Sequence, residues 1–258
     1  MRLRSESEKC GGILGAVYAE GLEQERCPVC YLVSISEARY AEALLYENVL
    51  DPGVRVRFIE SLGLCASHAW LLLDTAEKLY DRLGVSILYL DALKSSLESL
   101  DRLVEGDKDP SERCFMCRYS EDAEDRYVKL YRECLKPEDY RRSGAVFCLK
   151  HLRSILRIRG EAERKQILEI HREKLGKIVE NLERYIAKHS YDNKEPITKG
   201  EAKAAEQAIA SLKGLRTHIN IVGRHVERKE PIARRTVSML SNIYREIFKH
   251  PPTAREKK

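Results

Sequence analysis

The sequence predicts an all-α fold on the strength of three observations. Apolar residues recur three and four positions apart along most of the 258 residues, which is the spacing of an amphipathic helix. We find no convincing strand-like alternation with a period of two, and no Asn-Gly or Asp-Gly hairpin signal. One pattern of cysteine and histidine occurs twice, each time followed by apolar helical residues. We therefore expect a tandem duplication of a helical unit, followed by further helices.

The composition excludes several classes of protein. Hydrophobic residues make up 43% of the chain and charged residues 34%, which supports a packed core and argues against intrinsic disorder. No apolar run approaches the roughly 18 residues of a membrane helix. The first residues are charged rather than apolar, so the sequence predicts no signal peptide there. We therefore expect a cytoplasmic protein with no membrane contact. Asn and Gln are scarce while Glu, Lys and Arg abound, which is a thermophile-like bias.

Six of the eight cysteines form two matching sets with two histidines. Each set reads C-x2-C followed, more than 30 positions later, by C-x2-H. A C-x2-C turn lets two thiolates reach one ion, and a Cys and a His three positions apart on a helix share a face. A Cys at a helix start also gains from the partial positive charge there. The first set is Cys27, Cys30, Cys65 and His68, and the second is Cys114, Cys117, Cys148 and His151.

Three cysteines and one histidine are a common ligand set for structural zinc, so the sequence predicts two structural Zn²⁺ sites, each made from one local set. Disulfides are an alternative, because hyperthermophile cytosol tolerates them. A redox dithiol is another, although it expects a βαβ context that this sequence lacks. Four ligands per site leave no open position for catalysis, and no H-E-x-x-H or H-x-E…C-x-x-C motif occurs. We therefore expect no enzymatic activity and no small-molecule substrate.

The remaining cysteines and histidines have no assigned role at this point. We expect Cys134 to be a small buried residue on a helix and Cys10 to lie in a loose N-terminal segment. The other histidines fall at polar helical positions, where we expect them on the surface; they are His171, His189, His218, His225 and His250.

Other matches extend the repeat. Ten positions after its first cysteine each copy has a glutamate, followed by an arginine and a tyrosine: Glu37, Arg39 and Tyr40, then Glu124, Arg126 and Tyr127. We expect the tyrosines to pack inward and the charges to form a solvated face. A proline then interrupts each first helix, at Pro52 and Pro137.

The apolar spacing predicts the positions of further helices. We expect an amphipathic helix over residues 38–49 and a helix over residues 83–100 that links the two units. A linker should follow at 106–110. A long helix over 161–190, with a seam of Leu168, Leu175, Ile178, Leu182 and Tyr185, forms an antiparallel hairpin with a helix from about Glu201 to Ile219. A basic helix begins near Pro231 and precedes a mobile tail. The predicted domains are 1–108, 109–190 and 191–258.

Charge is unevenly distributed along the chain. Residues 1–110 carry a net charge of −7, residues 111–198 carry +4 and residues 199–258 carry +8. Such asymmetry points to an acidic or nucleic-acid partner, although most basic runs are only a solvated helix face, and this one could also pair with the acidic N-terminal half of the same chain. The candidate nucleic-acid contacts are Arg224, Arg228, Lys229, Arg234 and Arg235.

Residues 44–55 (LLYENVLDPGVR) and 64–70 (LCASHAW), together with Cys27-Pro28-Val29-Cys30 and the second copy, resemble an uncharacterised prokaryotic family of helical proteins with paired knuckles. This family is a domain of unknown function in bacteria and archaea. The resemblance spans roughly residues 15 to 185 and implies a cytoplasmic, zinc-binding protein with no known activity.

The leading hypothesis is a non-enzymatic, zinc-stabilised helical adaptor that binds a protein or ribonucleoprotein partner. One alternative is nucleic-acid binding through the basic C-terminal helices, which predicts binding that weakens steeply with salt. Another is a thiol or metal sensor, in which oxidation releases zinc.

Overall fold

The computed structural model describes residues 10–105, 114–190 and 192–215. The chain divides into one unit of residues 1–221, which contains the predicted domains 1–108 and 109–190 together, and a second of residues 222–258, which lies outside the described part. The described residues form helices and no strand, which confirms the all-α prediction. Among them, no helix has the length and apolar content to cross a membrane. The helices are α2 (Gly12–Leu22), α3 (Pro28–Tyr46), α4 (Pro52–Glu60), α5 (Ala66–Lys78), α6 (Leu83–Glu98), α7 (Leu100–Glu105), α8 (Phe115–Cys134), α9 (Pro137–Arg142), α10 (Leu149–Leu156), α11 (Glu161–Ala187) and α12 (Lys199–Lys213).

Local sequence explains where several of these helices begin. Prolines occupy the first position of α3, α4 and α9, where the missing N–H leaves no hydrogen bond unmade. The two prolines predicted to interrupt helices therefore begin new ones. The Asp51 carboxylate caps α4 by accepting a 2.8 Å hydrogen bond from the Val54 backbone N–H. Thr198 and Glu201 form a capping box at the start of α12.

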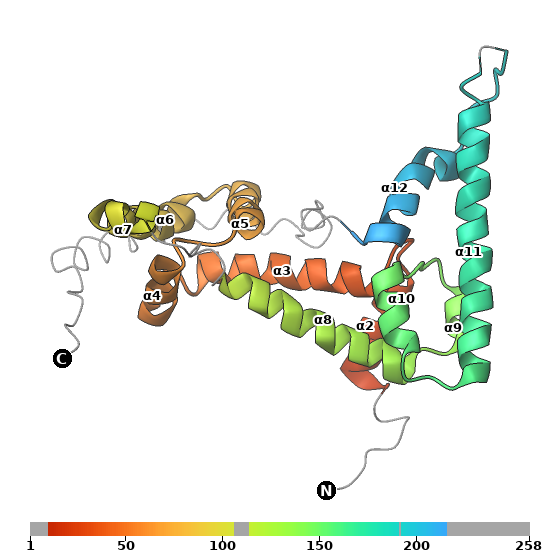
Figure 1. Ribbon diagram of the computed structural model, residues 1–258, viewed down its shortest axis with the longest axis horizontal. Coiled ribbons are helices and arrows are strands. Elements are labelled where there is room, and N and C mark those ends of the chain that lie inside the picture. Colours follow the sequence, from red (N-terminus) through yellow and green to blue (C-terminus); the bar gives the residue numbers. More distant parts are fainter. Residues whose placement is uncertain (1–9, 106–113, 191, 216–258) are drawn as a thin grey trace, which may run out of the picture. The chain divides into compact units, whose positions relative to one another are not determined.

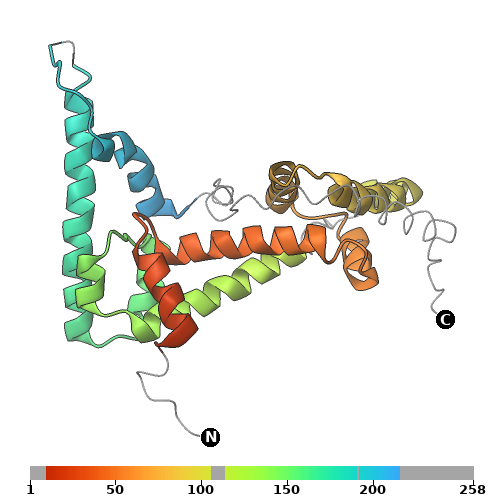
Figure 2. The same ribbon diagram turned by 180° about the vertical axis from the view of Figure 1, so that it is seen from behind.

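Helices α3 and α8 pack along each other in opposite directions (Figures 1 and 2). Near the end of α3, the ring of Tyr40 stacks on Tyr119 in the first turns of α8, with centroids 4.4 Å apart. Near the middle, the hydroxyls of Ser36 and Tyr127 share a 2.8 Å hydrogen bond. The start of each helix therefore lies beside the end of the other.

A buried hydrophobic cluster lies where the start of α3 meets the end of α8, together with α9, α10 and α11. Its centre is aromatic: the Phe147 ring contacts both Tyr131 and Tyr140, with centroids 5.4 and 5.1 Å apart, and all three side chains are fully buried. The predicted surface position of His171 is wrong. This side chain is buried, and its Nδ1 atom lies 2.7 Å from the Tyr140 hydroxyl.

The long helix α11 and helix α12 pack against each other, as two helices of a hairpin do. The seam of α11 begins one residue away from the predicted one, because Ile167 is buried while Leu168 is exposed. Helix α12 ends earlier than expected, at Lys213, because Gly214 takes a positive φ of 88° and turns the chain. The predicted linker at 106–110 and the basic helix from Pro231 lie outside the described residues.

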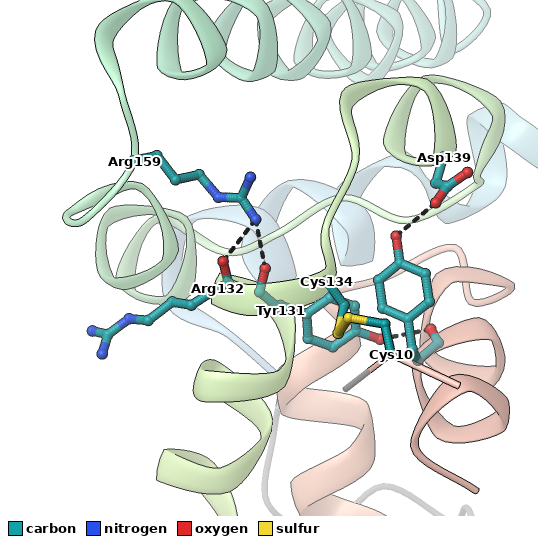
Figure 3. The surroundings of a disulfide bond; sticks show 7 residues. Cys10, Tyr131, Arg132, Cys134, Asp139 and Arg159 are labelled. Carbon is teal, nitrogen blue, oxygen red and sulfur yellow. Dashed lines mark hydrogen bonds between the residues drawn. A yellow bond between two sulfur atoms is a disulfide. The ribbon is translucent and has the colours of Figure 1, made fainter. Parts of the chain in front are cut away.

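A disulfide joins Cys10 to Cys134 and ties the chain before α2 to the end of α8 (Figure 3). Cys134 is buried on a helix, as predicted, but it is half of a disulfide, and the prediction that Cys10 lies in a loose segment is wrong. Two hydrogen bonds of 3.0 Å connect the same segments. The Tyr131 hydroxyl donates to the backbone oxygen of Tyr18, and the Tyr18 hydroxyl donates to the Asp139 carboxylate. Two cysteines left over from the paired motifs were the available signal for this bond.

Candidate metal centres

All eight predicted ligands occupy the first turns of four helices. A cysteine stands at the N-cap of α3, α5, α8 and α10: Cys27, Cys65, Cys114 and Cys148. The second ligand of each pair follows three residues later, so both point from the same helix start. The expected start of a helix at each C-x2-H is confirmed. Each C-x2-C, predicted as a tight turn, instead belongs to the first turn of a long helix.

The structure groups the ligands differently from the prediction. Cys27 and Cys30 of the first motif lie with Cys148 and His151 of the second, and we call this set the α3/α10 centre. The α5/α8 centre consists of Cys65, His68, Cys114 and Cys117. The predicted local sets are therefore wrong in their pairing, although the same eight residues make up the two groups.

The antiparallel packing of α3 and α8 explains this exchange. The ten residues from Cys27 to Glu37 span about 15 Å of helix, and His68 lies beside Glu37. A local set would require His68 to reach back along that length. The start of α8 already lies beside the end of α3, so Cys114 and Cys117 complete the centre there.

In the α3/α10 centre, the Nδ1 atom of His151 faces three sulfur atoms. It lies 3.2 Å from Cys148 and 3.3 Å from both Cys27 and Cys30, and the sulfurs of Cys30 and Cys148 are 3.8 Å apart. Cys27, Cys148 and His151 are buried, while Cys30 is partly exposed. Gly214 closes one side, where an added Cβ would lie 3.3 Å from the Cys30 sulfur. A side chain larger than hydrogen would therefore crowd the centre.

The α5/α8 centre has the same arrangement at the other end of the helix pair. The Nδ1 atom of His68 lies 3.2 Å from the sulfur of Cys65, 3.4 Å from that of Cys117 and 3.6 Å from that of Cys114. The sulfurs of Cys65 and Cys117 are 3.5 Å apart. Two of its thiols, Cys65 and Cys117, are partly exposed, against one in the α3/α10 centre. The α5/α8 centre is thus the more accessible of the two.

These distances match the edges of a tetrahedron around a metal ion. Zn–S bonds of about 2.3 Å and Zn–N bonds of about 2.0–2.1 Å imply S···S edges of about 3.8 Å and S···N edges of about 3.6 Å. The observed edges are equal to these or a few tenths of an ångström shorter. Both groups could therefore hold a metal ion with little movement. Two helix N-termini point at each centre and favour the negative charge of its thiolates.

A carboxylate stands behind each histidine. The Nε2 atom of His68 lies within hydrogen-bond distance, 3.4 Å, of Glu37, and that of His151 lies 3.1 Å from Glu124. A carboxylate there keeps the proton on Nε2 and leaves the Nδ1 lone pair for a metal, the usual arrangement around metal-binding histidines. The expectation of a solvated charged face is therefore wrong for these glutamates; Glu37 is only 2% exposed. Their matching place in both copies was the available signal.

Without a cation the ligands share protons unevenly. Hydrogen bonds from Cys27 and Cys30 hold the pKa of the Cys148 thiol far below its usual value, whereas burial raises the pKa of Cys27. Burial would lower the pKa of His68, but hydrogen bonds to Cys114 and Glu37 outweigh it and raise the pKa to about 10. Hydrogen bonding to His68 also overcomes the effect of burial on Cys114, whose pKa falls to about 6. Positive charge at the centre of each set thus stabilises its thiolates. The proton on the histidine supplies part of that charge, as the effect of His68 on Cys114 shows.

The remaining candidate residues do not join either centre. His189 is exposed, as predicted. The other three predicted surface histidines lie outside the described residues, and so do the five candidate nucleic-acid contacts: His218, His225 and His250, then Arg224, Arg228, Lys229, Arg234 and Arg235. Nucleic-acid binding through those residues stays a prediction.

Comparison with known proteins identifies one distant relative of unknown role. The chain is 26% identical over 204 residues to the "Uncharacterized 23.9 kDa protein in xynA 3'region" of Caldicellulosiruptor sp. (strain Rt8B.4), covering 76% of this chain and 98% of that protein. No family model matches the chain, and no solved structure matches it. The similarity supports a relationship to an uncharacterised protein and assigns no activity.

Proposed function

We propose that this protein binds two structural zinc ions and acts as a non-enzymatic helical adaptor for a macromolecular partner. The observation that carries the proposal is the closed set of four ligands in each centre, three thiols and one imidazole nitrogen at tetrahedral spacing. Thiolate and imidazole ligands suit zinc, and a four-ligand shell is typical of structural sites, whereas catalytic sites keep one position open.

The exchanged pairing supports a structural role for the metal. Each ion would join a helix start from residues 27–68 to one from residues 114–151, so metal binding and the packing of α3 against α8 would stabilise each other. The matched ligands and glutamates support an origin of the two halves by duplication.

Exposed aromatic residues on the α5 segment support partner binding. Trp70, the only tryptophan of the chain, is 64% exposed two residues after the ligand His68, and Tyr80 is 98% exposed just beyond the helix. Tryptophan and tyrosine are enriched among the residues that dominate binding energy in protein interfaces. The α5/α8 centre would therefore hold in place the helix that presents Trp70.

Metal analysis of the purified full chain tests the metal part of the proposal. We expect about two zinc ions per chain and slow reaction of the six ligand thiols with a thiol reagent until a chelator is added. Protein prepared without chelator that contains no metal, with these six thiols paired as disulfides, would contradict it.

Affinity capture from an extract of the source organism tests the adaptor part. We expect one or a few proteins to be retained by the full chain and lost when Trp70 and Tyr80 are both changed to alanine, with the zinc content unchanged. A matched control is Ile158→Ala, which alters a similarly exposed apolar residue elsewhere. Equal capture by all three proteins would show that the aromatic residues do not form the binding surface.

A further inference from the structure

The helices α6 and α7 carry an apolar stripe that the described part of the protein leaves uncovered. Five residues spaced alternately three and four apart are exposed by between 37% and 78%: Leu90, Leu93, Leu97, Leu100 and Val104. The side of α6 that faces the protein has its own apolar residues, including Val85, Leu88 and Ala92. The helix predicted over 83–100 is thus confirmed, but its leucines divide between a buried side and an exposed one.

The spacing of the exposed stripe identifies the kind of surface that would cover it. Alternating steps of three and four give a period of 3.5, the narrow seam of a coiled coil, whereas a helix facing a globular core shows a wider apolar face. Leu90, Leu97 and Val104 occupy one heptad position, and Leu93 and Leu100 the other. Ser99 separates α6 from α7 by one residue, and exposed apolar residues at the same spacing continue beyond it, at Leu100 and Val104.

We propose that this stripe pairs with the same stripe of a second copy of the chain, in antiparallel orientation, and so makes the protein a homodimer. Antiparallel pairing places Leu93 opposite Val104 of the second copy and Leu97 opposite Leu100 of the second copy. Because the dimer is two-fold symmetric, each of these two contacts occurs twice, so the seam has four apolar layers in all.

Charge complementarity favours a second copy over an unrelated helix. The exposed Lys94 lies between the layers of Leu93 and Leu97, and the exposed Asp101 lies between those of Leu100 and Val104. In the antiparallel pair these two gaps are opposite each other, so Lys94 of one copy faces Asp101 of the other, twice per dimer. Residues at such flanking positions set the choice and orientation of coiled-coil partners. A parallel pair would not bring these two residues together.

The seam is short, but its helices are already ordered. Isolated helices of this length are marginal in water. Here α6 is held by packing on α4 and α5, so less conformational entropy is lost on pairing than for two free peptides. Four layers bury a small surface, and small interfaces are typical of weak or transient association. We therefore expect a dimer that dissociates on dilution.

Sedimentation of the full chain over a concentration series, from low micromolar to submillimolar, tests the proposal. We expect a monomer–dimer equilibrium that Leu97→Lys abolishes and Leu212→Lys, a change at an exposed leucine of α12, leaves intact. K94E and D101K should each weaken dimerisation by about fivefold or more, because each places like charges opposite one another. The double variant K94E/D101K should restore the original dissociation constant.

Three results would overturn the proposal. They are a monomer at every concentration, a dimer insensitive to Leu97→Lys, and a double charge variant no better than the single ones. Helix content by circular dichroism and zinc content are measured for every variant, so that a loss of dimer is separated from a loss of fold.

Discussion

At the scale of single residues, the two glutamates behind the histidines connect the helix pair to the metal centres. Glu124 also pairs with Lys150, and the hydrogen bond from Lys150, together with the His151 imidazole 3.1 Å away, lowers the pKa of its carboxyl despite partial burial. Glu37 is more deeply buried and has one carboxylate oxygen without a hydrogen-bond partner. A buried carboxylate is unfavourable without compensation, which a hydrogen bond from a metal-bound histidine would supply.

We expect Glu37→Gln to weaken metal binding at the α5/α8 centre by about 10- to 100-fold and Glu124→Gln to do the same at the α3/α10 centre. The neutral amide polarises the imidazole less than the carboxylate does. Competition with a chromophoric zinc chelator measures this as one weakened site out of two. Glu121→Gln, at an exposed position of α8, is the control. Equal affinities in all variants would refute a role for the carboxylates.

His171 predicts how stability depends on pH. Burial, followed by the charge of Lys174, lowers its pKa from 6.5 to about 4. The unfolded chain therefore binds a proton below about pH 6.5 that the folded protein does not bind until about pH 4. As the pH falls from about 6.5 to about 4, the free energy of unfolding should therefore decrease, by at most about 3 kcal/mol.

Denaturant unfolding between pH 7 and pH 4 checks this expectation in the wild type and in His171→Gln. The glutamine can still accept from the Tyr140 hydroxyl but does not titrate, so the curve of the variant should be flatter. Metal ligands titrate in both proteins, and the difference between the two curves isolates His171. Parallel curves would mean that His171 contributes nothing to the acid sensitivity.

Residue types and short spacings were sufficient to predict which eight residues form the two candidate metal centres, because a cysteine N-cap with a second Cys or His three residues on is a local property. Burial of His171 was missed because the seam of α11 was assigned to Leu168, whereas Ile167, Ile170 and His171 face the core. The disulfide partner of Cys10 lies 124 residues away, and no local pattern encodes a contact at that distance.

At the scale of elements, the four helix starts act in two pairs. A helix start supplies partial positive charge, which favours thiolate over thiol, and a fixed geometry for residues three apart. The lengths of α3 and α8, 19 and 20 residues, then decide which starts meet. The sequence predicted a helix after each C-x2-C but not its full length, nor that the two helices pack side by side in opposite directions, since that depends on long-range packing.

Paired ligand variants separate the exchanged arrangement from the local one. Cys30→Ser with His151→Ala removes two ligands of the same centre, so the protein should retain about one zinc per chain. Cys30→Ser with His68→Ala removes one ligand from each centre and should weaken both, which leaves less than one zinc after desalting. Metal analysis of both proteins gives the answer. Local centres would produce the reverse order.

Two further double variants, built on Cys117, serve as controls for nonspecific unfolding. Cys117→Ser with His68→Ala should retain one zinc, and Cys117→Ser with His151→Ala should lose most of both. If all four double variants lose metal equally, the centres fold only together, and the single variants then show whether loss of one ion releases the other.

At the scale of the whole molecule, the candidate metal ions and the disulfide would bind the same two halves together. The α3/α10 centre joins residues 118 positions apart, and the α5/α8 centre joins residues 52 positions apart. Cross-links between distant positions reduce the entropy of the unfolded chain. We therefore expect the stability of residues 10–215 to depend strongly on metal.

Chelation tests this dependence. Excess chelator should lower the Tm by at least about 10 °C, since structural zinc contributes several kcal/mol and each kcal/mol shifts the Tm of a domain of this size by about 2–4 °C. Added zinc should restore the original transition. Differential scanning calorimetry measures both steps. A Tm that is the same with and without chelator would rule out a structural role for the metal.

The exchanged pairing also sets an order of events during synthesis on the ribosome. The α5/α8 centre has all its ligands once Cys117 has emerged, whereas Cys27 and Cys30 wait 118 residues or more for Cys148, roughly 6 to 24 seconds at ordinary translation rates. During that interval they share the nascent chain with Cys65 and His68, which in sequence alone form a complete but non-native chelating set. If α3 forms and α5 packs beside Glu37 before Cys114 emerges, about 15 Å of helix would separate Cys27 from His68, and the helix that carries the first motif would then keep the chain from binding its first metal ion in the wrong place.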